Sequence, residues 1–355
     1  MTDETESISL LPVELRDHTD LAIVAPTLTD GERRRLIETR IGALAESTQV
    51  RYRGEVGKFA AWCRGRKVSA LPAHPRTIEL YATTFIDAEL SVSSLNIAMA
   101  AIRWYHEAME LVSPFDNPGL KITIRGARKS LAKPPNKKTA LVVDTLIEVL
   151  DAMDYELKQV DDVWLPVSLN PADTRDRAIL LLGFSGALRR SEVCAIRVKD
   201  ITQHKQGITL DLADTKTAKP GELQHVAIRF GRQPTTCPAR LLDCWLALVR
   251  GQKGALVTPD SPVFRRVDRW RNIGDDPLWG RNVAAMVKKR VKAAGIDPES
   301  YSGHSMRSGF ATTAADLGYT LGEIVSVTRH KSREVAAQYI QSREDFQNRA
   351  TDLGL

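Results

Sequence analysis

The sequence predicts a mainly helical protein of two domains, the second of which also holds a small antiparallel β-sheet or hairpin. Helical periodicity dominates the chain, and a basic segment with two adjacent prolines separates two such regions. One pair of segments alternates apolar and polar residues as strands do. With 355 residues, 43% of them hydrophobic, the chain is long enough for each domain to bury its own core.

Residues 1–28 predict a disordered acidic tail. The first 30 residues hold seven acidic side chains and one basic side chain, and Pro12 and Pro26 interrupt a stretch without helical periodicity. The start of the chain lacks the basic and apolar regions of a signal peptide, and no apolar stretch approaches the roughly 20 residues that span a bilayer. We therefore expect a cytoplasmic protein that does not contact membranes.

Residues 29–120 predict a compact helical domain. Apolar residues recur at helical spacing in three successive segments, so that each helix buries one face. Serine and threonine favour the position before a helix, and proline favours its first turn. The three predicted helix starts are Ser47 or Thr48, Pro75 (for a helix to about Glu89), and Ser93 or Ser94.

Residues 121–138 predict a basic linker between the domains. The segment contains seven basic side chains and no acidic one, and it ends in Lys-Pro-Pro-Asn-Lys-Lys. Basic side chains that neutralise phosphates release counterions, so the run is typical of a polyanion-binding segment, but a solvated linker explains it equally well. The seven residues are Lys121, Arg125, Arg128, Lys129, Lys133, Lys137 and Lys138.

Residues 139–355 predict a second, α-rich domain with one β-hairpin. Its first strand alternates Ile208, Leu210 and Leu212 with polar residues, and its second strand does the same with Val226, Ile228 and Phe230. A turn-rich stretch lies between them. Residues 154–171 and the acidic tail have no interpretation from the sequence.

Neither the cysteines nor the histidines have metal-ligand spacing. Cys63, Cys194, Cys237 and Cys244 are scattered, and we expect all four to be reduced packing residues. His106 lies in helical register with apolar residues and is expected to be a packing or surface residue. The chain has no Walker loop and no Asp/Glu metal cluster, so we expect neither a metal nor a nucleotide cofactor.

Four separated motifs of the second domain carry candidate catalytic groups. Each has a plain structural reading when taken alone: a surface salt bridge, a solvent-facing lysine, a chance pair and a half-buried tyrosine. An arginine and a carboxylate three residues apart share one face of a helix, so the carboxylate can orient the guanidinium. The motifs are Arg189 with Glu192, Lys216 after the first strand of the hairpin, His304 with Arg307, and His330 with Tyr339.

Taken together, these motifs resemble the tyrosine recombinase (phage integrase) family. The family's catalytic domain carries R-x-x-E, a hairpin lysine, H-x-x-R, a histidine or tryptophan, and a tyrosine nine residues later, and this chain matches at every position. The likeness is greatest to Cre-like recombinases, spans roughly residues 45–350, and includes Ala60–Cys63 and Ser302–Ser305. Cre carries tryptophan at the position of His330, where most of the family has histidine.

The resemblance implies a reaction at a DNA phosphate without metal or ATP. A phosphodiester repels anionic nucleophiles, and free tyrosine is only about 0.1% ionised at neutral pH. Arg189 and Arg307 are therefore expected to clamp the non-bridging oxygens, with Tyr339 as nucleophile. His304 is the candidate base or the group that orients the phenol, and Lys216 is the candidate acid for the leaving 5′-hydroxyl. His330 is expected to bind the phosphate, and Glu192 to hold Arg189 or His304 in place.

The resemblance also implies the partners. Residues 29–120 would form a SAM-like core-binding domain that closes around double-stranded DNA with the catalytic domain, and four copies would assemble on two inverted-repeat-type sites. Ser342 can cap a last helix, with Phe346 and Leu353, that docks on a neighbouring copy or folds back on its own domain. The expected DNA contacts are Arg281, which can read guanine in the major groove, together with Arg51, Lys133, Lys137 and Lys138.

Two other functions share these sequence features. A type IB topoisomerase or a telomere resolvase nicks and reseals DNA with similar residues, and an accessory protein binds DNA without catalysis. The intact set of seven catalytic positions, Arg189 to Tyr339, argues against the accessory protein. The sequence does not indicate the DNA site, its spacer length or the genetic element that is served.

Overall fold

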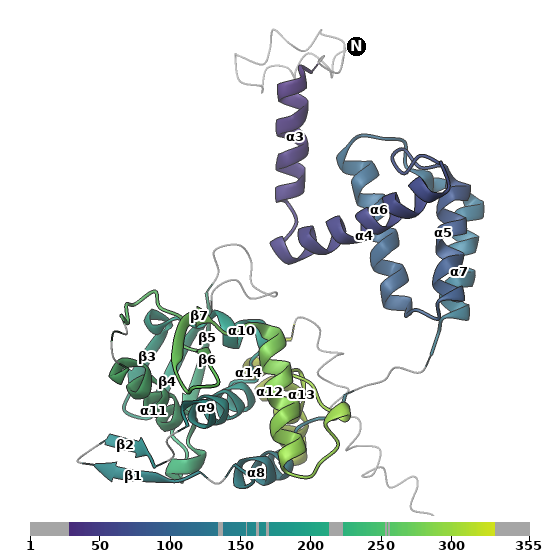
Figure 1. Ribbon diagram of the computed structural model, residues 1–355. Coiled ribbons are helices and arrows are strands. Elements are labelled where there is room, and N and C mark those ends of the chain that lie inside the picture. Colours follow the sequence, from purple (N-terminus) through teal and green to yellow (C-terminus); the bar gives the residue numbers. More distant parts are fainter. Residues whose placement is uncertain are drawn as a thin grey trace, which may run out of the picture. The chain divides into compact units, whose positions relative to one another are not determined.

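The chain divides into two compact units, Met1–Pro135 and Asn136–Leu355, in the computed structural model (Figure 1). The structure describes residues 28–133, 138–153, 155–160, 163–167, 170–212, 223–252, 254 and 256–330. Both units are mainly helical, and the strands of the described residues lie in the second unit, which confirms the expected fold class. None of the helices within these ranges is both long and apolar enough to cross a membrane.

The first unit is a set of helices around one apolar core. Helix α4 packs against α6, and α5 packs against α7. Phe59, Ile78, Leu95 and Ile102 are fully buried between them, as the periodicity predicts. The helices are α3 (Asp30–Gly42), α4 (Glu46–Gly65), α5 (Pro75–Asp87), α6 (Val92–Ala108) and α7 (Pro118–Ser130).

The predicted helix starts are correct for α5 and wrong by one to three residues for the other two. Pro75 is the first residue of α5. Helix α4 begins at Glu46, ahead of both predicted caps, and no side chain caps it. The cap of α6 is Ser91, whose Oγ accepts a hydrogen bond of 3.0 Å from the backbone N–H of Ser94. Several polar residues stand in tandem at both starts, and composition alone does not distinguish them.

Helix α7 occupies the first part of the segment predicted as a linker. Leu120, Ile124 and Ala127 recur at helical spacing and are buried in the first core. The side chain of Asn117 accepts a hydrogen bond of 3.1 Å from Leu120 N–H and so caps the helix. The basic residues from Lys121 to Lys129 therefore form the exposed face of a packed helix.

His106 is a buried packing residue, as expected. Its Nε2 accepts a hydrogen bond of 2.9 Å from the backbone N–H of Ala73, so Nδ1 carries the proton that is donated to the carbonyl of Ile102 at 2.7 Å. The histidine thereby ties the start of α5 to the end of α6.

Helix α9 (Pro171–Ser185) is the centre of the second unit. Ile179, Leu180 and Leu182 are all fully buried, because the apolar second half of α9 packs between neighbouring helices, with contacts to both α11 and α13. The surrounding helices are α8 (Val143–Asp151), α10 (Arg190–Ala195), α11 (Pro238–Gly251), α12 (Gly280–Ala293), α13 (Ser305–Asp316) and α14 (Leu321–Thr328).

The predicted hairpin is confirmed, and a further strand extends it to a three-stranded antiparallel sheet. Strands β3 (Ile201–His204), β4 (Gly207–Leu212) and β5 (Gln224–Arg229) pair in that order, with Ile208 opposite Ile228 and Leu210 opposite Val226. These apolar side chains face the core. Phe230 follows the end of β5, and the turn with Lys216 lies outside the described residues.

Two additional hairpins were not predicted. Strands β1 (Leu157–Val160) and β2 (Val163–Pro166) lie in the stretch that has no interpretation from the sequence, and β2 packs against α11. Strands β6 (Arg265–Val267) and β7 (Ile273–Pro277) precede helix α12. Each of these strands is five residues or shorter, which is too short for a reliable alternation of apolar and polar residues.

Candidate active site

Arg189 and Glu192 meet at the start of helix α10. Arg189 is the residue before the helix, and its backbone N–H donates to Glu192 Oε2 at 2.8 Å. Its guanidinium donates to the other oxygen of the same carboxylate, Oε1, at 2.5 Å. Only 3% of the Glu192 side chain is exposed, against 19% for Arg189. The carboxylate therefore fixes one edge of the guanidinium and leaves the arginine partly open to a ligand.

Two backbone carbonyls orient Arg307. The residue is 1% exposed, and its guanidinium donates to the carbonyl of Ala187 at 2.7 Å and to the carbonyl of Thr328. These carbonyl groups carry no net charge, so they fix the direction of the guanidinium without compensating its positive charge.

Close packing of helix α13 sets the position of Arg307. A Cβ atom on Gly309 would lie 1.9 Å from the carbonyl oxygen of Leu141, and one on Gly183 of α9 would lie 2.8 Å from the sulfur of Met306. Glycine at both positions lets α13 approach α9 and the segment before α8. Arg307, a candidate catalytic residue, is thus fixed on the core of the unit.

The two histidines lie in the field of these arginines. Desolvation, followed by the charges of Arg307, Arg189 and Arg190, lowers the pKa of His304 below its usual value. Desolvation and the charges of the same catalytic arginines lower the pKa of His330 to about 4. Both imidazoles are therefore neutral near pH 7 in the free protein, and each can accept a proton or a hydrogen bond.

The structure thus brings five of the seven predicted catalytic residues into one electrostatic cluster. They come from the turn after α9, the start of α13 and the end of α14. Lys216 and Tyr339 lie outside the described residues, as do Ser342, Phe346 and Leu353. No group of three or more His, Cys, Asp or Glu side chains within the described ranges is arranged to hold a metal ion, and the four cysteines are free thiols.

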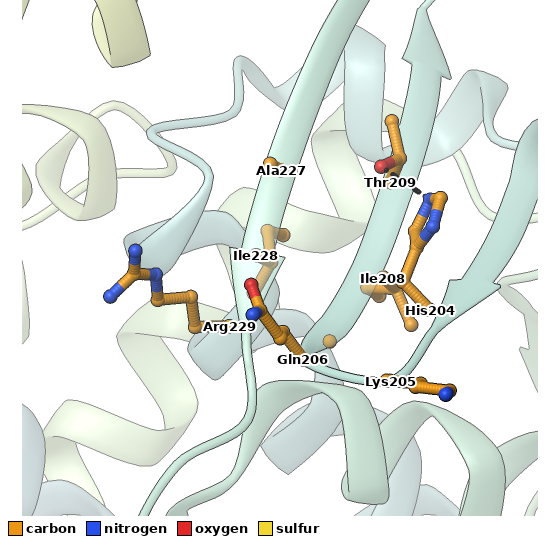
Figure 2. Close-up of a pocket in the computed structure, with 9 residues that line it drawn as sticks. His204, Lys205, Gln206, Ile208, Thr209, Ala227, Ile228 and Arg229 are labelled. Atoms are coloured by element: carbon orange, nitrogen blue, oxygen red, sulfur yellow. Dashed lines mark hydrogen bonds between the residues drawn. The ribbon is translucent and has the colours of Figure 1, made fainter.

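A hollow of about 480 Å³ on the three-stranded sheet lies apart from this cluster (Figure 2). It is lined by the β3–β4 turn and by β5, and His204 Nε2 lies 2.9 Å from Thr209 Oγ1. Figure 2 shows Lys205 and Arg229 pointing in different directions, so their charges do not converge on a common point. None of the five predicted catalytic residues that the structure describes lines the hollow.

A basic surface surrounds helix α12. Arg281 is exposed in its first turn, with the guanidinium carbon 5.6 Å from the centre of the Trp279 ring. Beside the helix is a hollow of about 500 Å³ with basic lining. Its exposed basic residues are Arg266, Arg269, Arg271 and Lys289.

The tip of the β6–β7 hairpin is part of this basic surface. A contribution from this hairpin was not predicted from the sequence. Asp268 Oδ1 accepts hydrogen bonds from the backbone N–H groups of Trp270 at 2.8 Å and Asn272 at 2.9 Å, which fixes the turn. Trp270 is 67% exposed, with the Arg269 guanidinium carbon 4.1 Å from its ring centre. The run Arg-Arg-Val-Asp-Arg-Trp-Arg, in which basic residues alternate with an aromatic one, is the signal that indicates such a surface.

The remaining predicted DNA contacts are all exposed where the structure describes them. Arg51 lies on α4, and Lys133 pairs with Glu89 at 3.2 Å, both in the first unit. In the second unit, Lys138 donates to the carbonyl of Glu299 at 2.6 Å. Lys137 lies outside the described residues. Contact of these residues with DNA therefore stays a prediction.

An apolar groove of about 500 Å³ lies between helices α13 and α14. Phe184 and Phe310 form part of its wall, with their rings edge to face at 6.2 Å. Leu317 and Tyr319 stand at the groove and are 71% and 53% exposed. Large apolar side chains exposed together typically mark a surface that another segment covers.

The helical fold, the small sheet and the grouping of arginines with histidines are those expected of a tyrosine recombinase. The model of the phage integrase family matches residues 152–345. The chain belongs to the phage integrase family and is a tyrosine site-specific recombinase.

Two relatives extend the likeness into the first unit. An integrase/recombinase xerD homolog from Selenomonas ruminantium is 30% identical over 310 residues, which cover 86% of this chain and 84% of the relative. The recombinase cre of Escherichia phage P1 is 23% identical over 297 residues and 80% of each chain. The expected likeness to Cre is therefore present, at a lower identity than the likeness to the xerD homolog.

Solved structures share the fold. The Tn1549 transposon integrase in complex with transposon right end DNA has a TM-score of 0.57 at 14% identity, covering 90% of this chain and 98% of that chain. The XerH site-specific recombinase, bound to a palindromic substrate in a post-cleavage complex, has a TM-score of 0.54 at 15% identity, covering 90% and 94%.

Proposed function

We propose that the protein cleaves and rejoins DNA strands at a specific site through a covalent 3′-phosphotyrosine at Tyr339. The observation that carries the proposal is the convergence of Arg189 and Arg307 beside two neutral histidines. The match to the phage integrase family, the similarity to an integrase/recombinase and the matching order of the motifs support the proposal further.

The arginines supply charge stabilisation of the scissile phosphate. Neutral carbonyls of Ala187 and Thr328 orient Arg307 without compensating its charge, and Arg189 presents the part of its guanidinium that Glu192 does not occupy. Negative charge grows on the non-bridging oxygens in the transition state, so these hydrogen bonds strengthen as the reaction proceeds. Loss of one such donor costs about 3 to 4 kcal/mol in comparable oxyanion sites.

At each step of the phosphoryl transfer, one P–O bond forms and another P–O bond breaks. The Tyr339 oxygen forms a bond to phosphorus and gives its proton to His304, which is neutral before the reaction because desolvation and then the surrounding arginines lower its pKa. The bond to the 5′-oxygen breaks, and Lys216 protonates that oxygen. His330 hydrogen-bonds the phosphate. A 5′-hydroxyl of another strand then reverses these steps and joins new partners.

The DNA is held by surfaces of both units. The basic surface around α12 suits a duplex, with Arg281 reading base edges and the flanking arginines contacting phosphates. Residues 29–120 act as the core-binding domain, with Arg51, Lys133, Lys137 and Lys138 contacting the duplex. The basic face of α7 supports this assignment, because its charges point to solvent.

Recombination of two duplexes through a Holliday junction requires four active sites, and we propose a homotetramer on DNA. The groove between α13 and α14 supports this assembly, since it offers an apolar seat for a helix of another copy. The segment that would occupy it is the C-terminal one, with Phe346 and Leu353. The alternative occupant is the same segment of the chain itself.

A nicked suicide substrate that carries the bound site tests the chemistry. The full-length protein should form a covalent adduct of slow migration in a denaturing gel, and Tyr339→Phe should abolish it. Tyr105→Phe, at a tyrosine of helix α6 in the first unit, is the matched control and should form the adduct normally. Absence of adduct with a bound substrate contradicts the proposal and favours an accessory DNA-binding protein.

The outcome of the chemistry is tested with intact sites. A recombinase forms four-stranded junctions from two duplexes, whereas a topoisomerase or a resolving enzyme of similar chemistry does not. Two-dimensional gel electrophoresis of reactions with paired sites separates the two. Adduct formation without any junction would contradict recombination and leave the cleavage chemistry standing.

A further inference from the structure

Arg329 lies one residue before His330 in a backbone conformation that is unfavourable for arginine. It follows the last residue of α14, with φ 55° and ψ 40°, and its backbone N–H donates to the carbonyl of Val325 at 2.8 Å. Glycine is the usual residue in this left-handed position, since a side chain there costs roughly 1 to 2 kcal/mol. The contacts of the Arg329 side chain can offset this cost.

The Arg329 side chain is buried and binds the same carboxylate as Arg189. It is 7% exposed, and Nη2 donates to Glu192 Oε2 at 2.8 Å. Nη1 donates to the carbonyl of Gly186 at 3.2 Å and to that of Val327 at 2.6 Å. Its Nε is buried and has no hydrogen-bond partner among the described residues, which adds a further cost to this placement.

Glu192 is therefore shared between two arginines of different function. Arg189 holds Oε1 with its side chain and Oε2 with its backbone N–H, and Arg329 holds Oε2 from the other turn. The carbonyl of Arg329 also accepts a longer contact of 3.5 Å from Arg189 Nη2. One residue thus links the turn that carries Arg189 to the turn that carries His330.

We propose that Arg329 is a positioning residue that locks Glu192 and the Gly186–Arg189 turn, so that the Arg189 guanidinium faces the scissile phosphate. The inference rests on the proposed function, because it assigns Arg189 to that phosphate. Arg329 itself does not touch the substrate: its donors are directed to Glu192, Gly186 and Val327.

The charge of Arg329 also keeps Glu192 ionised. Burial raises the pKa of Glu192, but hydrogen bonds from Arg189 and the charges of Arg329 and Arg189 outweigh it, so the pKa lies below its ordinary value. Only the ionised carboxylate accepts from both arginines at once. Removal of the Arg329 charge should therefore raise the pH at which Glu192 takes up a proton and releases Arg189.

Three substitutions separate positioning from stability. Arg329→Met removes the charge and all three hydrogen bonds, Arg329→Lys keeps the charge without the planar fork, and Arg329→Gly also relieves the left-handed backbone. Single-turnover adduct formation should fall roughly 10- to 100-fold in Arg329→Met, the range for residues that orient functional groups, with DNA affinity unchanged. Arg329→Lys should recover most of that loss, and Arg329→Gly should react as slowly as Arg329→Met.

Two further readouts distinguish the idea from a merely structural role. The acid limb of the pH–rate profile should move to higher pH in Arg329→Met but not in Arg329→Lys. In the Glu192→Gln background, Arg329→Met should slow adduct formation no further, because both changes remove the same restraint. An additive loss, or a lysine variant as slow as the methionine variant at equal melting temperature, overturns the proposal.

Arginine side-chain NMR tests the restraint without any cleavage. The Nη1–H signal of Arg189, whose proton is donated to Glu192 and which is identified with Arg189→Lys, should be protected from exchange in the wild-type protein and in Arg329→Lys, and should lose protection in Arg329→Met. Unchanged protection in Arg329→Met overturns the proposal. Failure of the wild-type protein to form an adduct would instead contradict the proposed function, so the two failures are distinguishable.

Discussion

The substitution Asp176→Asn should strongly destabilise the second unit, because Asp176 is the centre of a buried ion network between α9 and α12. Its Oδ1 accepts from Arg175 at 2.7 and 3.0 Å, and its Oδ2 accepts from Arg290 at 2.6 and 2.9 Å. The Asp176 side chain is 3% exposed and that of Arg290 is 10% exposed. Four charge-assisted hydrogen bonds thus converge on one carboxylate out of contact with water.

Asparagine keeps the size of the side chain and removes the charge. Arg290 would then retain only Asp173, which it contacts at 2.6 Å and which is 20% exposed. Removal of one partner from a buried ion pair costs about 3 to 5 kcal/mol. For a domain of this size, each 1 kcal/mol lowers the melting temperature by about 2 to 4 °C, so the expected loss is about 6 to 20 °C.

Differential scanning calorimetry of the full-length chain measures this loss. Leu95→Ala, at a fully buried position of the first unit, identifies the transition of that unit. The matched control is Asp260→Asn, which breaks an ion pair of 2.5 Å with Lys199 between side chains that are 72% and 54% exposed; it should leave the melting temperature unchanged. A shift for Asp176→Asn below about 2 °C, or one equal to that of the control, would refute the reasoning.

Three other expectations concern the site, the DNA surface and the assembly. NMR titration of His330 in the DNA-free protein should give a midpoint near pH 4, because desolvation and the catalytic arginines oppose protonation, and a midpoint near the ordinary 6.5 or so would contradict this. Trp270→Ala should weaken duplex binding about 10-fold in fluorescence anisotropy, since it removes the aromatic tip that stacks on Arg269; unchanged affinity counts against a DNA contact there. Leu317→Arg places a charge at the edge of the apolar groove, and should lower recombination at least about 10-fold without changing the melting temperature. Normal tetramers on DNA in sedimentation would show that the groove has another occupant.

The fold could be predicted where long periodic segments carry it. Helices α4, α5 and α6 and the β4–β5 hairpin follow from apolar spacing, since each buries one face. The β6–β7 hairpin could not be predicted, because Arg265–Val267 has three residues and Ile273–Pro277 buries only Ile273. Helix α7 was mistaken for part of a linker because its charges dominate the composition, while only Leu120, Ile124 and Ala127 reveal the buried face.

The candidate site could be predicted by residue type and order, but not by the contacts that hold it. Arg307 is oriented by the carbonyls of Ala187 and Thr328, and every residue supplies a carbonyl, so the sequence gives no sign of these partners. Arg329 escaped notice for a different reason. A residue between a threonine and a histidine at the end of a helix has no periodic signal, and its importance depends on a left-handed backbone that sequence patterns assign to glycine.

The backbone of the site explains why its arginines form a single unit. Ala187 adopts φ 44° and Arg329 adopts φ 55°, so each of the two turns contains a non-glycine residue in the left-handed region. Such conformations persist only where the surroundings determine them. Here the surroundings are the arginines themselves: Arg307 holds the carbonyl of Ala187, and Arg329 holds that of Gly186. The arginines of the candidate site and the turns that carry them therefore stabilise one another, and a change at either turn should alter the position of both guanidinium groups.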